Sequence, residues 1–498
     1  MSYPDTHVRN RLVDENLFLK LPREEVLPPE FVSSKDRLPS PQWQGHERVV
    51  ECYWKAWEIA FRNLRHPPAQ SPLIANFIDT AFNDCTFMWD SAFMTMFGRY
   101  GSRAFNFQRT LDNFYSRQHS DGFICREIAI KDGSDRFERF DPSSTGPNLM
   151  PWAEWEYYRY SQDKDRLAKV FPVLMAYTQW LRLHRTWPDG SYWSCGWGCG
   201  MDNQPRLPVG YHVSFDHGHL SWIDTTLQQI FMNKLLIRMA DEIGREDEMT
   251  EVAAETEQLT GLVNNRMWDG ESAYYYDRFR DGSLSRTKTI GAYWALLAGV
   301  IPEQNCPRFL QHLRNPDEFA RNHRVPTLSA DDPAYESDGC YWRGGVWAPA
   351  NYMVLRGLDA VGAHDLAHEI GINHLENVVT VFESTGTFWE NYAPESASPG
   401  KPALGDFVGW TGLTPIAILF ESVFGLRAGV DRNELVWDVR LLEEHGVDRY
   451  PFRADAVMDL RCAKRSSPDE EPVIHAITTQ PVTLRVEWAG GSKTIPLH

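Results

Sequence analysis

Apolar residues recur at spacings of three and four between about residues 46 and 425. This spacing places apolar side chains along one face of a helix, so it predicts a mainly helical body. Twelve helices are predicted, over residues 46–64, 88–99, 102–118, 148–161, 164–185, 216–243, 246–267, 286–299, 303–315, 343–361, 363–382 and 406–425.

The links between these predicted helices alternate in length. Links that leave the even-numbered helices are mostly a few residues long, which favours antiparallel neighbours. Links that leave the odd-numbered helices are long, and they cover residues 65–87, 119–147, 186–215, 268–285, 316–342 and 383–405. Six helical hairpins of this kind predict an (α/α)6 toroid. All long loops would then emerge at one end, which we expect to be the functional face.

The two ends of the chain have different patterns. Residues 1–45 are rich in proline and weakly periodic, as is typical of an N-terminal arm that lies over a domain. The helical domain is predicted over 46–426. From 427 to 498 the pattern alternates, for example in Glu434–Leu441 and Val482–Trp488, which predicts a small C-terminal β-rich module.

Charge and composition narrow the possible partners. The net charge of −18, without a basic stripe, argues against a nucleic-acid partner. Met1–Asn10 is polar and no segment has the apolar length of a membrane span, so neither a signal peptide nor a membrane association is expected. The eight cysteines lack a zinc-site spacing, which favours reduced thiols in a cytoplasmic protein. We expect a monomer or a homodimer.

Aromatic residues make up 13% of the chain, and 19 of them are tryptophans. Flat indole rings are good platforms for sugar rings, although core packing is the commoner role of any single Trp. The unusual polar and aromatic pairs fall in, or at the edge of, the long loops rather than at both ends. These are Trp89–Asp90, Arg126–Glu127, Asp202, Tyr341–Arg343 and Trp389–Glu390.

Two carboxylates in these loops are the candidate catalytic residues. Asp202 lies in Gly200–Arg206, and Glu390 lies in Phe388–Tyr392. Two carboxylates that face each other across a pocket can hydrolyse a glycosidic bond. Aromatic walls would desolvate Asp202 and keep it protonated as a general acid, whereas an ionised Glu390 would activate water. The structural alternatives are an Asx turn or a salt bridge to Arg206 for Asp202, and a helix cap for Glu390.

The remaining candidates would bind substrate rather than react with it. Each also has a structural alternative: a first-turn acid, a local ion pair or cation–π packing. The candidate substrate-binding residues are Trp89, Asp90, Arg126, Glu127, Trp342, Arg343, Trp389 and Trp410. His212, His217 and His219 lack a metal-binding spacing, and no phosphate loop or nucleophile elbow is present, so neither a metal nor a cofactor is expected.

Taken in order, these motifs resemble glycoside hydrolase family 63 and the related trehalase-like and mannosylglycerate or glucosylglycerate hydrolases. The resemblance rests on Gly122–Ile128, Gly200–Arg206, Tyr341–Tyr352, Trp389–Tyr392 and Gly409–Thr411, with Trp89–Ser91 similar to a trehalase element. It implies an inverting α-glycosidase with Asp202 as general acid and Glu390 as general base. Asn203 departs from the family pattern, which has a second Asp there. The short loops suggest a small α-glucoside or related α-glycoside as substrate.

Two other functions are compatible with the same toroid. A glycoside phosphorylase would need basic and hydroxyl groups where Glu390 lies. A non-catalytic sugar-binding protein would keep the aromatic residues without needing both carboxylates. A toroidal sugar epimerase would need a His acid–base pair, which the sequence does not place.

Overall fold

The computed structural model describes residues 8–80, 83–429 and 433–498, so part of the polar segment Met1–Asn10 lies outside the described residues. The long helices are α2 (Glu47–Arg62), α3 (Met88–Gly98), α5 (Met150–Ser161), α6 (Lys164–His184), α8 (Ile223–Ile243), α9 (Thr250–Arg266), α12 (Ala348–Ala360) and α13 (His364–Thr385). Short helices are α1 (Phe31–Ser34), α4 (Asp112–Tyr115), α7 (Gly196–Cys199), α10 (Trp294–Ala298) and α11 (Cys306–Gln311).

Shorter turns connect these helices. The 3₁₀ turns are η1 (Arg11–Glu15), η2 (Leu17–Lys20), η3 (Lys35–Arg37), η4 (Arg99–Gly101), η5 (Phe107–Leu111), η6 (Pro142–Ser144), η7 (Glu246–Met249), η8 (Ile290–Tyr293), η9 (Glu303–Asn305), η10 (His312–Arg314) and η11 (Trp410–Leu413). Segment η12 (Thr414–Val423) is wound as a π-helix.

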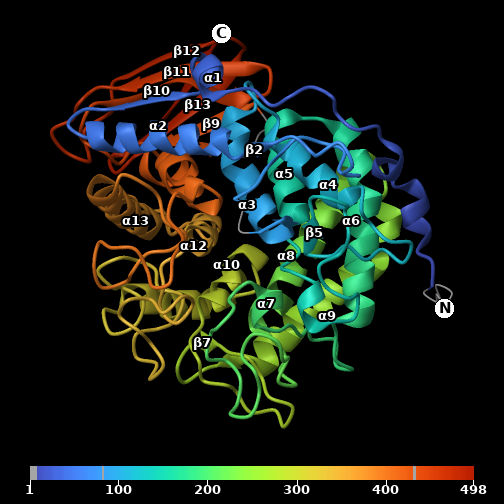
Figure 1. Ribbon diagram of the computed structural model, residues 1–498. Helices are drawn as coiled ribbons and strands as arrows, with labels where there is room; N and C mark the ends of the chain where they lie inside the picture. The colour runs from blue at the N-terminus through green and yellow to red at the C-terminus, as the bar shows by residue number, and fades with distance from the viewer. Residues whose placement is uncertain (1–7, 81–82, 430–432) are drawn as a thin grey trace.

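The helical elements pack in two layers (Figure 1). In the inner layer α3 packs against α5, α5 against α8, α8 against α10, α10 against α12, and α12 against η11, which returns to α3. In the outer layer α6 packs on α5 and α8, α9 on α8, α13 on α12, and α2 on α13 and η12. The inner helices are buried nearly all round because they contact both the centre and the outer layer.

A separate sheet region follows the helices and lies beside α2 in Figure 1. Its strands are β8 (Leu426–Ala428), β9 (Glu434–Asp438), β10 (His445–Arg453), β11 (Ala456–Cys462), β12 (Ile474–Thr478), β13 (Val482–Trp488) and β14 (Gly491–Leu497). One sheet has the order β14-β13-β9-β8, and the other has the order β1-β10-β11-β12. Strand β1 (Ser40–Trp43) comes from the predicted N-terminal arm, so the arm contributes a strand to the C-terminal sheets.

Two-stranded pairs lie within the helical part. They are β2 (Leu64–Arg65) with β3 (Phe77–Ile78), β4 (Cys85–Phe87) with β5 (Glu127–Ala129), and β6 (Trp268–Asp269) with β7 (Tyr274–Tyr275). The pairing of β4 with β5 places Phe87 opposite Glu127. It therefore joins two long loops that carry candidate site residues.

The predicted helices over 46–64, 88–99, 148–161, 164–185 and 363–382 are confirmed to within a few residues. The helix predicted over 102–118 is wrong, because that segment contains only η5 and α4. Its polar residues bond to the neighbouring loop instead: the Asn113 side chain accepts the N–H groups of Ile74 and Ala75.

Other predicted helices begin too early or are too long. Helix α8 begins at Ile223 rather than 216, since Ser221 bridges to Arg278. Helix α12 begins at Ala348 rather than 343, since Val346 bridges to Pro326 and Tyr392. The segments predicted over 286–299 and 303–315 are short turns and helices, and the last predicted helix, over 406–425, comprises η11 and η12.

Candidate active site

A cavity of about 380 Å³ lies where several inner elements begin. Its wall includes the start of α3, the strand β5, the loop before α8, the loop before α12 and the start of η11. Seven of the ten candidate site residues line it: Trp89, Asp90, Arg126, Glu127, Asp202, Trp342 and Trp410. The long loops therefore do bring residues far apart in sequence to one place.

Asp202 lies in a loop that is fixed on both sides. Gly200 has φ +77°, a backbone conformation that favours glycine, and a Cβ there would lie 3.4 Å from the Trp89 indole. The Asn203 side-chain oxygen accepts from Trp342 N at 2.9 Å, and its nitrogen donates to Cys340 O at 2.8 Å. An Asp in place of Asn203 could not donate the second bond, which explains the departure at this position.

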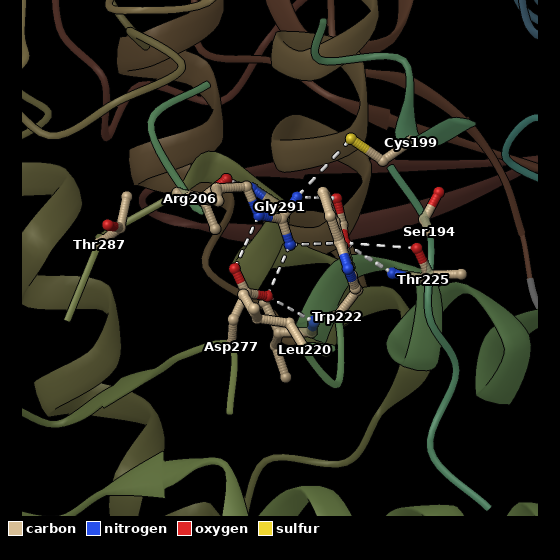
Figure 2. A network of polar contacts seen from close by, with 12 residues as sticks. Ser194, Cys199, Arg206, Leu220, Trp222, Thr225, Asp277, Thr287 and Gly291 are labelled. Atoms are coloured by element: carbon tan, nitrogen blue, oxygen red, sulfur yellow. Dashed lines mark hydrogen bonds and ion pairs between the residues drawn. The ribbon is translucent and has the colours of Figure 1, made fainter. Parts of the chain in front are cut away.

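Arg206 anchors the end of this loop (Figure 2). Its guanidinium donates to both carboxylate oxygens of Asp224 and of Asp277 at 2.6–2.8 Å, and it lies 4.2 Å from the Trp222 ring centroid. Asp224 is in the first turn of α8. The salt-bridge alternative for Asp202 is thus wrong, because Arg206 is occupied by two other carboxylates.

Glu390 is 3% exposed and is held by two donors. The Tyr341 hydroxyl donates to its Oε1 at 2.8 Å, and Leu404 N donates to its Oε2 at 3.2 Å. Tyr341 lines the cavity, whereas Glu390 lies behind it, bonded to this phenol, and is not itself one of the lining residues. Cys340 and Tyr341 have φ +33° and φ +67°, and such strained backbone is typical of functional sites.

Four carboxyl groups gather around this cavity, and burial raises the pKa of each. The pKa of Asp202 rises to about 6, although the Arg126 charge opposes the rise. The pKa of Glu390 rises to about 7, and the Asp202 charge contributes to it. Burial also raises the pKa of Asp90 and that of Glu127. Asp202 and Glu390 therefore both change their protonation state near neutral pH.

The order of these two pKa values does not by itself assign an acid and a base. Both donors to Glu390, the Tyr341 hydroxyl and Leu404 N, stabilise its ionised form, whereas the hydrogen bond that lowers the pKa of Asp202 comes from the backbone of Asp202 itself. The hydrogen bonds from Tyr341 and Leu404 N orient the Glu390 carboxylate as an anion, which favours Glu390 as the base.

The remaining candidates have defined positions. The Asp90 Oδ1 is buried without a hydrogen bond among the described residues, so it is available to a ligand hydroxyl. Arg126 pairs with Glu127 at 2.7 Å, donates to Ser143 O and lies over the Phe137 ring. Trp342 stacks on Trp347 with centroids 3.8 Å apart, and the Trp410 indole donates to Glu390 O.

Arg343 and Trp389 do not line this cavity. The Arg343 guanidinium donates to Ala334 O at 2.9 Å and to Glu336 at 3.2 Å, on the outer side of its loop. The Trp389 indole donates to Thr385 and lies beside Gly405. These contacts favour structural roles for both residues.

Sequence reasoning did not select several residues that line the cavity. They are Asn83, Phe87, Met88, Arg136, Phe137, Gly146, Pro147, Trp197, Gly200 and Tyr341. Tyr341 had a visible signal, because it directly precedes Trp342. Among the described residues no group of three or more His, Cys, Asp and Glu side chains is arranged to hold a metal ion.

Comparison with known proteins places the chain in a family. Residues 84–411, about two thirds of the chain, match the mannosylglycerate hydrolase MGH1-like glycoside hydrolase domain. The chain belongs to this family. It is therefore a glycoside hydrolase of the family 63 type, as the sequence motifs indicated.

Individual relatives of this glycoside hydrolase are distant. Mannosylglycerate hydrolase MGH2 of Selaginella moellendorffii is 24% identical over 405 residues, which cover 67% of this chain and 80% of that protein. The mannosyl-oligosaccharide glucosidase of Saccharomyces cerevisiae is 21% identical over 54% of this chain but only 34% of its own length. A crystal structure of family 63 mannosylglycerate hydrolase from Thermus thermophilus, with Tris and D-glycerate, has a TM-score of 0.59 at 20% identity and covers 73% of this chain and 98% of that one.

Proposed function

We propose that this glycoside hydrolase is an inverting α-glycosidase with an (α/α)6 toroid, in which Asp202 is the general acid and Glu390 the general base. The observation that carries the proposal is the single cavity shared by Asp202 and the Tyr341 phenol that holds Glu390. Asp202 would protonate the leaving glycosidic oxygen while Glu390 deprotonates a water on the opposite face of the sugar. The closed series of inner-layer contacts supports the toroid.

The walls of the cavity fit a sugar ring. Trp89, Trp342 and Trp410 supply flat apolar surfaces, and Asp90 and the Arg126–Glu127 pair supply groups that hydrogen-bond hydroxyls. A volume of about 380 Å³ suits a small glycoside rather than a long glycan. We propose an α-glucoside as substrate, and the reaction requires no cofactor. The protein would act in the cytoplasm, as a monomer or homodimer without a nucleic-acid partner.

An α-linked glycoside of a hydroxy acid is the second candidate substrate. The named mannosylglycerate hydrolases favour it, since glycerate carries a carboxylate. Arg136 also lines the cavity and is exposed, and its side chain has no hydrogen bond or ion pair with another described residue. Its guanidinium could bind such a carboxylate beside the scissile bond.

Hydrolysis of a panel of α-linked disaccharides, glucosylglycerate and mannosylglycerate tests the proposal, with product anomers followed by proton NMR. Initial release of the β-anomer is expected. Initial release of the α-anomer would contradict the roles of Asp202 and Glu390. Faster turnover that depends on added phosphate would identify a phosphorylase instead. Tight sugar binding without turnover of any compound would favour a binding protein.

A further inference from the structure

A second and larger cavity, of about 710 Å³, lies at the other end of the inner helices. The active-site cavity is lined by the beginnings of α3, η11 and the loops that enter α8 and α12, whereas this cavity is lined by the later parts of α5, α8, α12 and η12 and by η4. Its opposite wall is formed by β8, β9, β10 and β13 of the sheet region. It therefore separates the helical body from the sheets and is distinct from the active site.

The inner wall of this cavity is electrically balanced. Arg99 pairs with Glu156 at 2.8 Å and Glu421 at 2.6 Å, and Arg356 pairs with the same two carboxylates at 2.9 and 3.3 Å. The Tyr352 hydroxyl also donates to Glu421. These two cations and two anions neutralise one another, so this part of the wall has no unpaired charge that would bind a ligand.

The cavity as a whole is lined by an excess of positively charged side chains. Seven Arg and Lys side chains line the whole cavity, against four acidic ones, in a chain whose net charge is −18. Arg238 on α8 is exposed and has no hydrogen bond or ion pair with another described residue. The closest contacts of the Arg159 guanidinium are long, at 3.7 Å to Glu156 and 3.5 Å to Ala428 O.

Two further cations reinforce this excess. The buried Nε of Arg485 on β13 makes no hydrogen bond, and it lies 3.4 Å from Glu487 and 3.8 Å from Glu434. Lys234 donates to Ala298 O and Gly299 O at the end of α10. Burial and the Arg238 charge lower the pKa of Lys234, and neither side chain makes an ion pair with another residue that the structure describes.

Cations at helix C-termini commonly compensate the helix dipole, and Lys234 does so at α10. That role does not account for Arg238 and Arg485, because neither donates to a helix carbonyl. Arg238 has no ion pair with another described residue, whereas Arg159 and Arg485 make long ion pairs, at 3.7 Å to Glu156 and 3.4 Å to Glu487. The three guanidiniums come from α5, α8 and β13, on both sides of the cavity. Guanidinium groups match the oxygens of a phosphate group in pairs.

We propose that this cavity is a binding site for a phosphate-bearing anion, held by Arg159, Arg238 and Arg485. A bound anion would link the helical body to the sheet region, because its ligands belong to both. The aromatic walls formed by Trp155 and Phe452 leave room for an organic group attached to the phosphate. The site is independent of the sugar cavity and of the proposed reaction.

Thermal unfolding of the full chain tests this site, with inorganic pyrophosphate or glucose 6-phosphate as probe and sodium chloride at equal ionic strength as reference. Binding to the folded state should raise the Tm by about 2 °C or more at saturating probe. The double variant Arg159→Gln/Arg238→Gln should lose most of that rise. Arg280→Gln, which removes an exposed arginine outside this cavity, should keep it.

A rise with both probes indicates phosphate esters, and a rise with pyrophosphate alone indicates an inorganic polyphosphate. An equal rise in the Arg159→Gln/Arg238→Gln variant, or no rise beyond that of sodium chloride with either probe, would overturn the proposal. Circular dichroism of the double variant, matched to that of the parent chain, separates lost binding from lost folding.

Discussion

At the scale of single residues, Asp202 and Glu390 are the groups whose removal should stop the reaction. Asp202→Asn and Glu390→Gln should each lower kcat by about 10³-fold, because a neutral amide neither donates a proton to the leaving oxygen nor accepts one from water. Sugar affinity, measured by calorimetry, should change little. Arg343→Gln is the matched control, since Arg343 does not line the cavity and donates to Ala334 O. A kcat that survives Asp202→Asn would remove Asp202 from the acid role.

The same two groups set the pH dependence. Activity needs a proton on Asp202 and none on Glu390, whose pKa values are raised to about 6 and about 7. Below both values Glu390 is protonated and cannot act as base, and above both Asp202 is ionised and cannot act as acid. A plot of kcat/KM against pH should therefore be bell-shaped with its maximum near 6.5, and its limbs belong to the pair. A profile flat between pH 5 and 8 would contradict this.

Tyr341 offers a finer test of the base. Its hydroxyl donates to Glu390 and lowers the pKa of that carboxyl relative to burial alone. Tyr341→Phe removes the donor, so the pKa of Glu390 should rise, and the alkaline limb of the kcat/KM profile, which the higher pKa of the pair sets, should move to higher pH. We expect kcat to fall about tenfold. A lower kcat with an unmoved alkaline limb would indicate a role in packing only.

At the scale of elements, the ion pairs of Arg206 hold the Asp202 loop on the start of α8. Arg206→Ala leaves Asp224 and Asp277 buried without their partner, which should cost about 3–5 kcal/mol of unfolding free energy. Chemical denaturation measures this loss. Arg280→Ala, at an exposed arginine in a nearby loop, should stay within about 0.5 kcal/mol of the parent chain. Equal losses in the two variants would mean that the network does not support the loop.

The pattern of apolar residues was sufficient to predict helices such as α6 and α13, because their apolar positions recur on one face over many turns. It failed where tertiary contacts replace helical hydrogen bonds, as in 216–222 and 343–347, which pair with distant loops. Asp202 was recognisable from its Gly- and Pro-rich surroundings. The contacts of the Arg343 side chain could not be predicted in this way. Its partners Ala334 and Glu336 lie in an irregular loop, and the local sequence does not show how that loop folds back on Arg343.

At the scale of the whole molecule, the chain closes on itself where β1 joins β10. Nearly the full length of the sequence separates these strands, which pair from Ser40 opposite Asp448 to Trp43 opposite His445. Trp43 is 5% exposed, stacks on His46 at 3.9 Å and meets Phe424 edge-on. The indole therefore contacts the residue before α2 and the end of the helical part, while the Trp43 backbone pairs with strand β10 of the sheet region.

Trp43→Ala should destabilise the molecule by about 3–5 kcal/mol, because it leaves a cavity at this junction. Activity at low temperature should stay close to that of the parent chain, since Trp43 does not line the active-site cavity. Val32→Ala, at an apolar residue of the same arm that is 86% exposed, is the control and should have almost no effect. Scanning calorimetry measures both variants. If Trp43→Ala unfolds at the same temperature as Val32→Ala, the arm lies on the surface without joining the helical body to the sheets. A separate transition at lower temperature would show that the sheets unfold on their own once the junction is lost.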